Sequence, residues 1–236
     1  MSSSPPFEYK GTELGTFATA RVWKEYLRSH IRPYTQGEVM EVGAGIGSTT
    51  EVLGDDTSTR WVCVEPDPEL ASVLSGRIVE GTLPASCQVV NGTIQDAPGS
   101  FDCILYIDVL EHIEHDRSEL RKAAARLRSN GYLVVLSPAH PWLFTPFDRA
   151  IGHWRRYTRR MLADIAPTDV RMVRSIYLDS VGMLASLANR FLLRSSEPSE
   201  KQVAFWDRVL VRLSRSIDPL LRYRVGKSVL VIWQKS

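Results

Sequence analysis

Residues 39–50 read Val-Met-Glu-Val-Gly-Ala-Gly-Ile-Gly-Ser-Thr-Thr, and this stretch decides the fold. The apolar run over residues 38–42 predicts a buried strand. The three alternating glycines, Gly43, Gly45 and Gly47, predict a tight turn into a helix. Because glycine has no side chain, a ligand can approach the backbone closely at such a turn. The stretch therefore predicts the first strand, turn and helix of an alternating α/β fold.

The same alternation continues along the chain. Short apolar runs predict strands over residues 38–42, 60–64, 87–90, 102–107, 132–137, 170–178 and 228–233. Helical spacing predicts helices over residues 17–31, 48–53, 68–79, 118–127, 159–165, 180–193 and 201–221. We expect a Ser/Pro-rich, disordered start over residues 1–11 and a single α/β domain over residues 12–236, with residues 180–221 forming a helical cover.

The charge and the spacing of the glycine turn bear on its ligand. Glu41 stands two residues before the first glycine, where a carboxylate would repel a pyrophosphate and would suit a cation. The dinucleotide fingerprint also needs a glycine where this chain has Ser48. S-adenosylmethionine carries a sulfonium and an ammonium group, so the sequence favours it over a nicotinamide dinucleotide.

The second expected strand ends in Val64-Glu65-Pro66, about twenty residues after the glycine turn. A carboxylate at this strand tip can accept both ribose hydroxyls of an adenosine, and Pro66 offers the adenine an apolar face. Glu65 could instead support the start of the following helix. The glycine turn nearby favours the nucleoside interpretation.

Together these motifs resemble the class I S-adenosylmethionine-dependent methyltransferases, in particular the small-molecule group that includes the ubiquinone-biosynthesis enzymes. The resemblance spans residues 38–137. It is carried by the glycine turn, by Glu65-Pro66, by Asn91-Gly-Thr-Ile-Gln-Asp96 and by residues 101–112, which end in Asp-Val-Leu-Glu-His. It implies a seven-stranded Rossmann-like sheet in the order 3-2-1-4-5-7-6, with the last strand antiparallel.

The resemblance also implies where S-adenosylmethionine binds. Its methionine part would rest on the glycine turn and on the backbone near Ile107, and its ribose on Glu65. Because Thr93 stands where many relatives have an adenine-binding aspartate, we expect Ile94 and Asp96 to contribute there. The predicted cofactor-binding residues are Glu41, Gly43, Gly45, Gly47, Glu65, Pro66, Thr93, Ile94, Asp96 and Ile107.

Several histidines follow the fourth and fifth strands, where open α/β sheets hold their ligands. Methyl transfer requires a positioned nucleophile and removal of its proton, so His112, His140 and His153 are the candidate bases. Asp108, Glu111 and His112 resemble a metal-binding arrangement in ubiquinone-pathway O-methyltransferases. They equally suit the start of a helix, and we favour catalysis without a metal.

The stretch over residues 138–160 combines aromatic residues, histidines and arginines. Its Asp-Arg-x-x-Gly-His-x-Arg-Arg-Tyr core, with the closing Gly226-Lys-Ser228, resembles a bacterial methyltransferase subgroup associated with glycosyltransferases. The predicted substrate-binding residues are Trp142, Phe147, Arg156, Tyr157 and Arg160. Arg156 and Arg160 lie one helical turn apart and could hold one anionic group, or they could pair with surface carboxylates.

Charge is unevenly distributed along the chain. Residues 1–154 hold 13 Lys and Arg against 20 Asp and Glu, whereas residues 155–236 hold 16 against 7. The basic C-terminal third suits an anionic substrate or an acidic membrane surface, although solvated helix faces give the same pattern. No nucleic-acid partner is expected, because the basic residues alternate with apolar helix positions and no stacking motif is present.

Cellular location follows from the cysteines and the apolar runs. Cys63, Cys87 and Cys103 lie in predicted strands without metal or redox spacing, which is typical of a reducing cytoplasm. No apolar run is long enough to cross a bilayer, and residues 1–10 do not resemble a secretion signal. We expect a cytoplasmic enzyme that methylates a small-molecule or lipid-like acceptor. The basic C-terminal third is compatible with an anionic acceptor and with peripheral membrane contact. The alternative is a non-catalytic nucleotide- or nucleic-acid-binding module.

Overall fold

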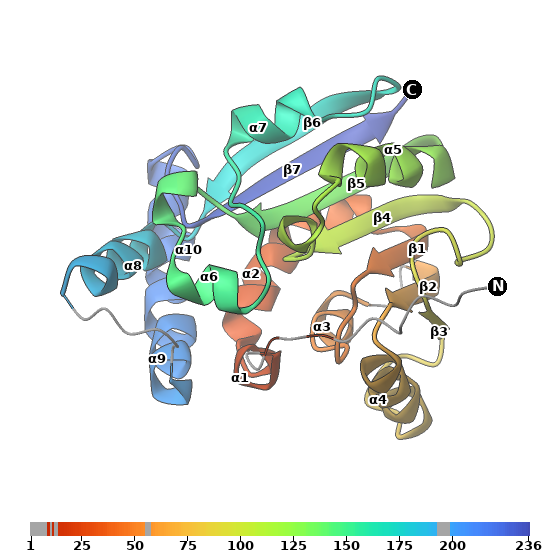
Figure 1. Ribbon diagram of the computed structural model, residues 1–236, viewed down its shortest axis with the longest axis horizontal. Coiled ribbons are helices and arrows are strands. Elements are labelled where there is room, and N and C mark those ends of the chain that lie inside the picture. Colours follow the sequence, from red (N-terminus) through yellow and green to blue (C-terminus); the bar gives the residue numbers. More distant parts are fainter. Residues whose placement is uncertain (1–8, 10, 12–13, 55–57, 193–198) are drawn as a thin grey trace.

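A computed structural model describes residues 9, 11, 14–54, 58–192 and 199–236. Its strands form one seven-stranded sheet in the order β3-β2-β1-β4-β5-β7-β6, which confirms the expected order (Figure 1). The strands are β1 Gly37–Val42, β2 Ser58–Glu65, β3 Cys87–Asn91, β4 Phe101–Ile107, β5 Leu127–Pro138, β6 Val170–Leu178 and β7 Ser228–Lys235. Strand β7 runs antiparallel to both of its neighbours, β5 and β6.

The strand boundaries differ from the sequence prediction mainly in β5. This strand begins at Leu127 rather than near residue 132, because Leu127 pairs with Phe101 across a register shift. Asn130 adopts a φ of 65° within the added segment, a conformation that asparagine tolerates better than most residues. The apolar pattern alone does not reveal such an irregular extension.

Ten α-helices are described: α1 Leu14–Ala18, α2 Arg21–Ile31, α3 Thr50–Leu53, α4 Pro68–Val79, α5 Asp116–Arg126, α6 Pro146–Ala150, α7 Arg159–Asp164, α8 Ser180–Leu192, α9 Glu200–Phe205 and α10 Val211–Leu220. Short 3-10 turns cover Arg32–Tyr34, Leu110–His112 and Pro141–Leu143, and a π-helical turn, Trp206–Leu210, joins α9 to α10. The helix expected over residues 17–31 is two helices, since the non-helical backbone of Ala20 separates them. The helix expected from residue 48 begins at Thr50, and α6 forms within residues 138–153, for which the sequence pattern predicted no helix.

Alternate residues of the central strands pack against different helix layers. Met40 and Ile104 face the layer that contains α5 and α7, whereas Val39 and Leu105 face the layer that contains α2 and the α9–α10 helix. Burial on both faces explains why these strands read as continuous apolar runs. The carboxyl ends of β1, β4 and β5 therefore meet at one edge, between the two layers.

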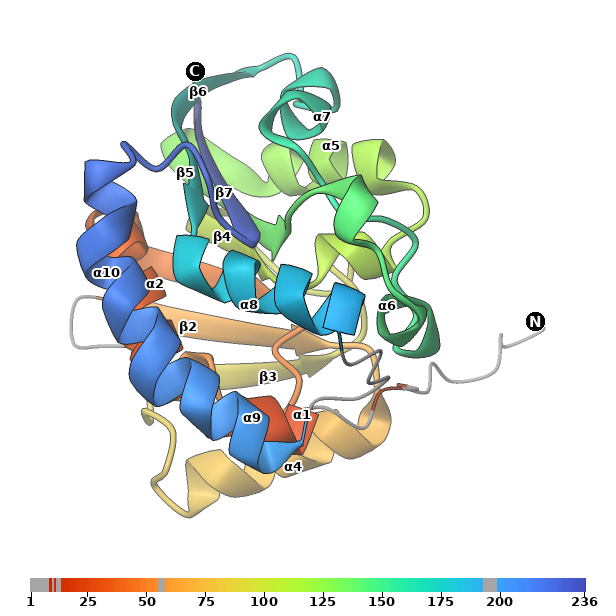
Figure 2. The ribbon, with the colours of Figure 1, turned by 90° about the vertical axis from the view of Figure 1, so that its left-hand side faces the viewer.

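Buried carboxylates join the helices of the C-terminal cover to the rest of the domain. Asp207 accepts the backbone N–H groups of Val22 and Trp23 at the start of α2, at 3.2 and 2.8 Å. Asp218 accepts the Tyr26 hydroxyl at 2.9 Å and the backbone N–H of Asp179 at 2.7 Å. Figure 2 shows α8 and the continuous α9–α10 helix together at one end of the sheet. The cover is thereby fixed beside the strand ends.

Candidate active site

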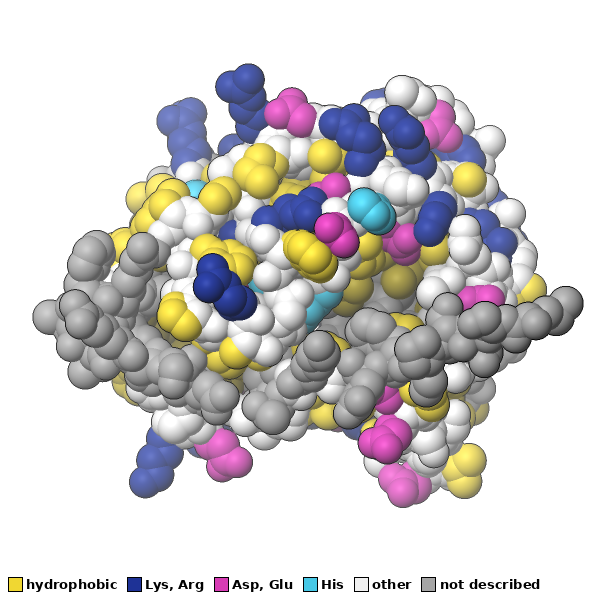
Figure 3. All heavy atoms as spheres, in the orientation of Figure 1, with side chains coloured by type: hydrophobic (Ala, Val, Ile, Leu, Met, Phe, Trp, Pro, Cys, Tyr) yellow, Lys and Arg dark blue, Asp and Glu magenta, His cyan; other side chains and the backbone are white. Residues whose placement is uncertain are grey.

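A cavity of about 1020 Å³ lies at the carboxyl ends of β1, β4 and β5. It extends from the glycine turn to helices α8 and α9. Figure 3 shows the face of the molecule on which acidic, basic and histidine side chains stand among hydrophobic ones. Its apolar lining includes Leu14, Phe17, Trp23, Leu27, Ile46, Leu143, Phe147, Ile151, Phe205, Trp206 and Leu210. The cavity is at the large end for ligand sites, which leaves room for two ligands side by side.

The three glycines of the turn have different roles. Gly43 and Gly45 line the cavity, with φ angles of 69° and 56°. Gly47 does not line it, and a Cβ at Gly47 would lie 2.6 Å from a Leu74 methyl carbon. A Cβ at Gly43 would likewise lie 2.6 Å from Val109. Two glycines therefore face a ligand, while Gly47 allows the turn to pack on α4.

The two acidic residues predicted for the cofactor lie behind the cavity wall. Glu41 is 2% exposed and accepts hydrogen bonds from the Thr50 hydroxyl at 2.7 Å and the Trp61 indole N–H at 3.0 Å. Its carboxylate therefore supports the turn from beneath and does not reach the cavity. Glu65 accepts the backbone N–H of Gly45 at 2.8 Å and that of Asp67 at 3.0 Å. Glu65 thus contacts the turn directly.

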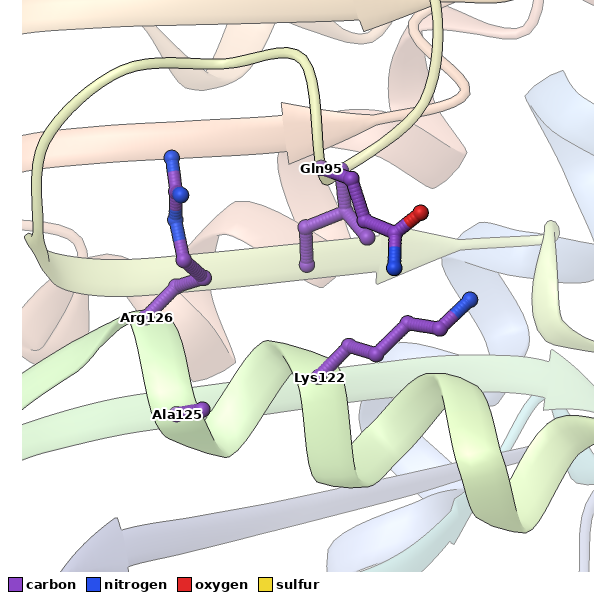
Figure 4. A pocket seen from close by; sticks show the side chains of 5 residues that line it. Gln95, Lys122, Ala125 and Arg126 are labelled. Carbon is purple, nitrogen blue, oxygen red and sulfur yellow. The ribbon is translucent and has the colours of Figure 1, made fainter.

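The predicted adenine segment after β3 lies outside this cavity. Asp96 accepts hydrogen bonds from the Thr93 backbone N–H and hydroxyl, at 2.7 and 2.9 Å, and both residues are exposed. Ile94 is buried in the core. A separate pocket of about 280 Å³ lies between this loop and α5, where Lys122 points toward Gln95 (Figure 4). Pro66, at the tip of β2, is also absent from the cavity lining.

Four titratable side chains form one part of the cavity wall, beside Ile107. Asp108, Glu111 and His112 follow β4, and His153 comes from the segment after β5. Burial and the neighbouring His153 lower the pKa of His112 to about 4, and burial raises the pKa of Asp108 to about 6. Burial and then Asp108 raise the pKa of Glu111 well above its usual value. Both Glu111 carboxylate oxygens are buried without a hydrogen-bond partner among the described residues.

Glu111, His112 and His153 converge closely enough to be considered as metal ligands. One potential ligand atom from each lies within 4.8 Å of the others. The Glu111 carboxylate and His153 Nε2 are 3.9 Å apart. Asp108, which the sequence pattern grouped with Glu111 and His112, is not in this set. A proton on Glu111 or a cation between the three side chains would each compensate the buried carboxylate.

A second carboxylate orients His153. Asp148 Oδ1 lies 3.0 Å from His153 Nδ1, and Arg156 binds both oxygens of Asp148 at 2.9 Å. Burial would raise the pKa of Asp148, but the hydrogen bonds from His153 and Arg156 outweigh it and hold that pKa well below the usual value. An ionised carboxylate only accepts, so Nδ1 of His153 donates and Nε2 faces the Glu111 side.

The predicted substrate residues separate into two groups. Phe147 and Arg156 line the cavity, but Arg156 is already engaged by Asp148. Tyr157 is 1% exposed and donates its hydroxyl to Asp116 at 2.8 Å, so it is part of the core. Arg160 is 91% exposed and 3.9 Å from Asp164, on the surface of α7. Arg156 and Arg160 therefore do not converge on one anion, and the alternative, in which each pairs with a carboxylate, is the one observed.

Two further predicted residues point away from the cavity. The His140 ring stacks on Tyr177 at 4.8 Å between centroids, and its Nε2 lies 3.1 Å from the Gly226 carbonyl oxygen. Trp142 packs against His140 at 5.4 Å and is 52% exposed. Of the three candidate bases, His112 and His153 thus reach the cavity.

Three cavity residues were not predicted from the sequence. Lys227 lies 4.0 Å from the Trp206 ring centroid and 3.8 Å from Asp179, and its burial lowers its pKa. Lys24 donates to the carbonyl oxygens of Phe17 and Ala18 at the end of α1. Tyr9, within the stretch expected to be disordered, donates its backbone N–H to Asp67 at 2.8 Å. The Gly226-Lys-Ser228 motif was the one available signal, for Lys227.

Comparison with known proteins agrees with this geometry. A family model described as a methyltransferase domain matches residues 19–173. The chain belongs to the methyltransferase domain family. Ajmaline N-methyltransferase from Rauvolfia serpentina is 23% identical over 188 residues, which cover 78% of this chain and 57% of that enzyme. The chain thus spans a little over half the length of this curated relative.

Solved methyltransferase structures share the fold. Coclaurine N-methyltransferase bound to N-methylheliamine and S-adenosylhomocysteine has a TM-score of 0.60 and 15% identity, over 100% of this chain and 77% of that chain. NodS, an N-methyltransferase from Bradyrhizobium japonicum WM9 in complex with S-adenosylhomocysteine, has a TM-score of 0.56 and 14% identity, over 89% and 84% of the two chains. At this level of identity, these structures show that the chain has the fold of methyltransferases that bind S-adenosylhomocysteine. None of its described helices combines the length and apolar character needed to cross a membrane.

Proposed function

We propose that this methyltransferase acts on a small amphiphilic acceptor with an anionic group, within a single domain over residues 12–236 and in the cytoplasm. The observation that carries the proposal is the large cavity, whose lining is apolar over α1, α2 and α9 and charged near the strand ends. Such a lining suits a molecule with a hydrocarbon part and a polar end. A nucleotide- or nucleic-acid-binding module would not need this apolar extension.

The residues present fit S-adenosylmethionine. Gly43 and Gly45 leave the turn open to a ligand, and Glu65, which accepts the N–H of Gly45 from behind the cavity wall, is the proposed acceptor of the ribose hydroxyls. Asp108 provides an acidic group on the cavity wall for a cationic ligand, a role first expected of Glu41. Bound there, S-adenosylmethionine supplies a methyl group activated by its positively charged sulfur. Pro66, Thr93, Ile94 and Asp96 remain candidates for adenine contacts through a rearranged loop.

His153 is the proposed proton acceptor. Asp148 fixes its tautomer through Nδ1, which leaves Nε2 free to take the proton of an acceptor hydroxyl or amine in the cavity. His112, whose burial keeps its pKa at about 4, is neutral at neutral pH and stands beside it, with 4.5 Å between ring centroids. His112 is thus the second candidate.

Lys227, rather than Arg160, is the proposed anchor for an anionic group. Its ammonium lines the cavity and lies 3.8 Å from Asp179, beyond hydrogen-bond distance, whereas Arg156 makes two hydrogen bonds to Asp148. No metal is required in this proposal. Burial raises the pKa of Glu111 and lowers that of His112 to about 4, so both side chains favour their neutral forms.

The experiment that tests the proposed function is calorimetric titration with S-adenosylhomocysteine, followed by a crystal structure of the complex. We expect binding, with the homocysteine part over Gly43 and Gly45 and the remaining cavity open toward α8 and α9. Absence of binding would overturn the cofactor site. A ligand that filled the whole cavity alone would remove the proposed acceptor site.

A further inference from the structure

The outer face of the α9–α10 helix carries apolar and basic side chains in two adjacent rows. We define this outer face by Phe205, Val209 and Leu213 in the apolar row and by Arg208 and Arg212 in the basic row. Members of each row are four residues apart, so each row runs along the helix. Phe205, Val209 and Leu213 are 57%, 41% and 48% exposed.

The opposite side of the α9–α10 helix packs into the domain, which leaves the residues of the outer face on the surface. Val203, Trp206 and Val211 pack into the core, and Asp207 and Asp218 are buried as caps of neighbouring helices. The acidic residues are therefore withdrawn from the surface, and the arginines remain on it. Arg208 and Arg212 form no hydrogen bond or ion pair with any other residue that the structure describes.

The positive, apolar surface continues beyond the two rows. Leu220 and Leu221 follow at 81% and 41% exposure, and Arg222 and Arg224 are exposed after them. Glu200 is the one exposed acidic residue within residues 199–227. An apolar row bordered by guanidinium groups is the arrangement of helices that lie in the interface of an anionic bilayer.

The outer face also meets the large cavity. Lys201, Gln202 and Phe205 are exposed and line the cavity at the same time, so the cavity reaches the surface beside α9. Figure 2 shows that α8, which contributes Ala185 and Ser186 to the cavity, lies along the same end of the molecule. A molecule leaving a bilayer on this side would pass directly into the cavity.

We propose that the outer face of α9–α10 docks on a bilayer containing anionic lipids. The phosphate groups complement Arg208 and Arg212, and the apolar row enters the boundary between headgroups and acyl chains. Docking stands independently of the catalytic proposal. Only the entry of the acceptor from the bilayer rests on the proposed function.

Vesicle co-sedimentation tests the docking. The full chain should bind vesicles of phosphatidylcholine with phosphatidylglycerol, bind vesicles of phosphatidylcholine alone weakly, and be released by salt. Arg208→Gln with Arg212→Gln should weaken binding by roughly tenfold or more. Val209→Ser with Leu213→Ser should weaken it by a similar factor, because two apolar anchors are lost.

Matched variants lie elsewhere on the surface. Val73→Ser with Val79→Ser removes two exposed valines from α4, and Arg121→Gln with Arg160→Gln removes two arginines from α5 and α7. We expect these variants to bind vesicles as the unchanged protein does. S-adenosylhomocysteine titration of every variant verifies that the domain remains folded and separately tests the cofactor site.

Three results would overturn the docking proposal. The unchanged protein could fail to bind anionic vesicles while binding S-adenosylhomocysteine. The α9–α10 variants could bind vesicles no more weakly than the matched variants. Finally, ultracentrifugation could show a dimer that Val209→Ser with Leu213→Ser dissociates, without vesicle binding, which would assign the face to a second copy of the chain.

Discussion

At the residue scale, Glu65 holds two backbone N–H groups with the carboxylate that would also receive a ribose. Glu65→Ala should weaken S-adenosylhomocysteine binding by about 2 kcal/mol, because charge-assisted hydrogen bonds to the ligand and to Gly45 are lost together. Calorimetry measures the change. Glu69→Ala, an exposed position in the first turn of α4, is the control and should bind normally. Equal affinities of the two variants would contradict the role of Glu65.

Glu41 predicts a pH dependence of stability. Burial raises its pKa from 4.5 to about 7, so the folded state holds its proton more tightly than the unfolded state. The associated stability is fully present below pH 4.5 and is lost as pH rises toward 7. Glu41→Gln keeps an acceptor for Thr50 and Trp61 but cannot ionise.

Denaturant unfolding from pH 4.5 to 8 measures this effect. As pH rises from 4.5 to 8, the free energy of unfolding of the unchanged protein should fall by on the order of 2 kcal/mol relative to that of Glu41→Gln. If the free energy of unfolding changes with pH in the same way for both proteins, the pKa of Glu41 is the same in the folded and unfolded states.

Lys227 gives a test of acceptor charge. With S-adenosylhomocysteine bound, octyl phosphate should bind roughly tenfold more tightly than octanol, because a charge-assisted hydrogen bond to the ammonium is added. Lys227→Met should remove the difference and leave octanol binding similar. Lys201→Met, which removes an exposed lysine at the edge of the cavity, is the control variant and should keep the preference for octyl phosphate. A preference for octyl phosphate that survives Lys227→Met would place the anion elsewhere.

At the element scale, the segment from α6 to α7 depends on Asp148. Its side chain caps α6 through Thr145, orients His153 and binds Arg156, so one carboxylate joins three parts of the segment. The sequence left two alternatives for Arg156 and Arg160, convergence on one anion or pairing with carboxylates, and the structure shows the pairing. The spacing of Arg156 and Arg160 suggested convergence, whereas in the folded chain Thr158 begins α7 between them and turns Arg160 outward.

Asp148→Asn should therefore destabilise the protein by about 3 kcal/mol, because the Arg156 guanidinium is left without its neutralising partner. Asp164→Asn, which removes only the exposed partner of Arg160, should change stability by less than about 0.5 kcal/mol. Thermal and denaturant unfolding compare the two variants. Similar losses would mean that the Asp148 pairs are as weak as a surface ion pair.

Much of the fold could be predicted because it rests on local patterns. Continuous apolar runs identified the strands, and the glycine turn identified the end of the sheet at which the large cavity lies. The lining of the acceptor end could not be predicted in this way. Tyr9, Lys24 and Lys227 come from segments far apart in the chain, and no local spacing brings them to one cavity. His140 was predicted as a candidate base. Its backbone has a φ of 65°, and its ring stacks on Tyr177 outside the cavity.

At the scale of the whole molecule, the metal-free proposal predicts indifference to chelation. After dialysis against a chelator, S-adenosylhomocysteine affinity and melting temperature should be unchanged, and Mg²⁺ or Mn²⁺ should not raise the melting temperature. The physical reason is that burial favours the neutral forms of Glu111 and His112, which reduces the charge that a cation would balance. Mn²⁺ binding that His153→Ala abolishes would instead identify Glu111, His112 and His153 as ligands.

Strand β7 has a consequence for the synthesis of the chain. It follows every other element in sequence, yet it lies between β5 and β6 and supplies all of the described pairing of β6 within the sheet. Until residues 228–235 have left the ribosome, β5 presents an open edge to which another nascent chain could pair. The sheet is thus completed from its interior, and the interval before β7 arrives is the period in which a growing chain most needs a chaperone.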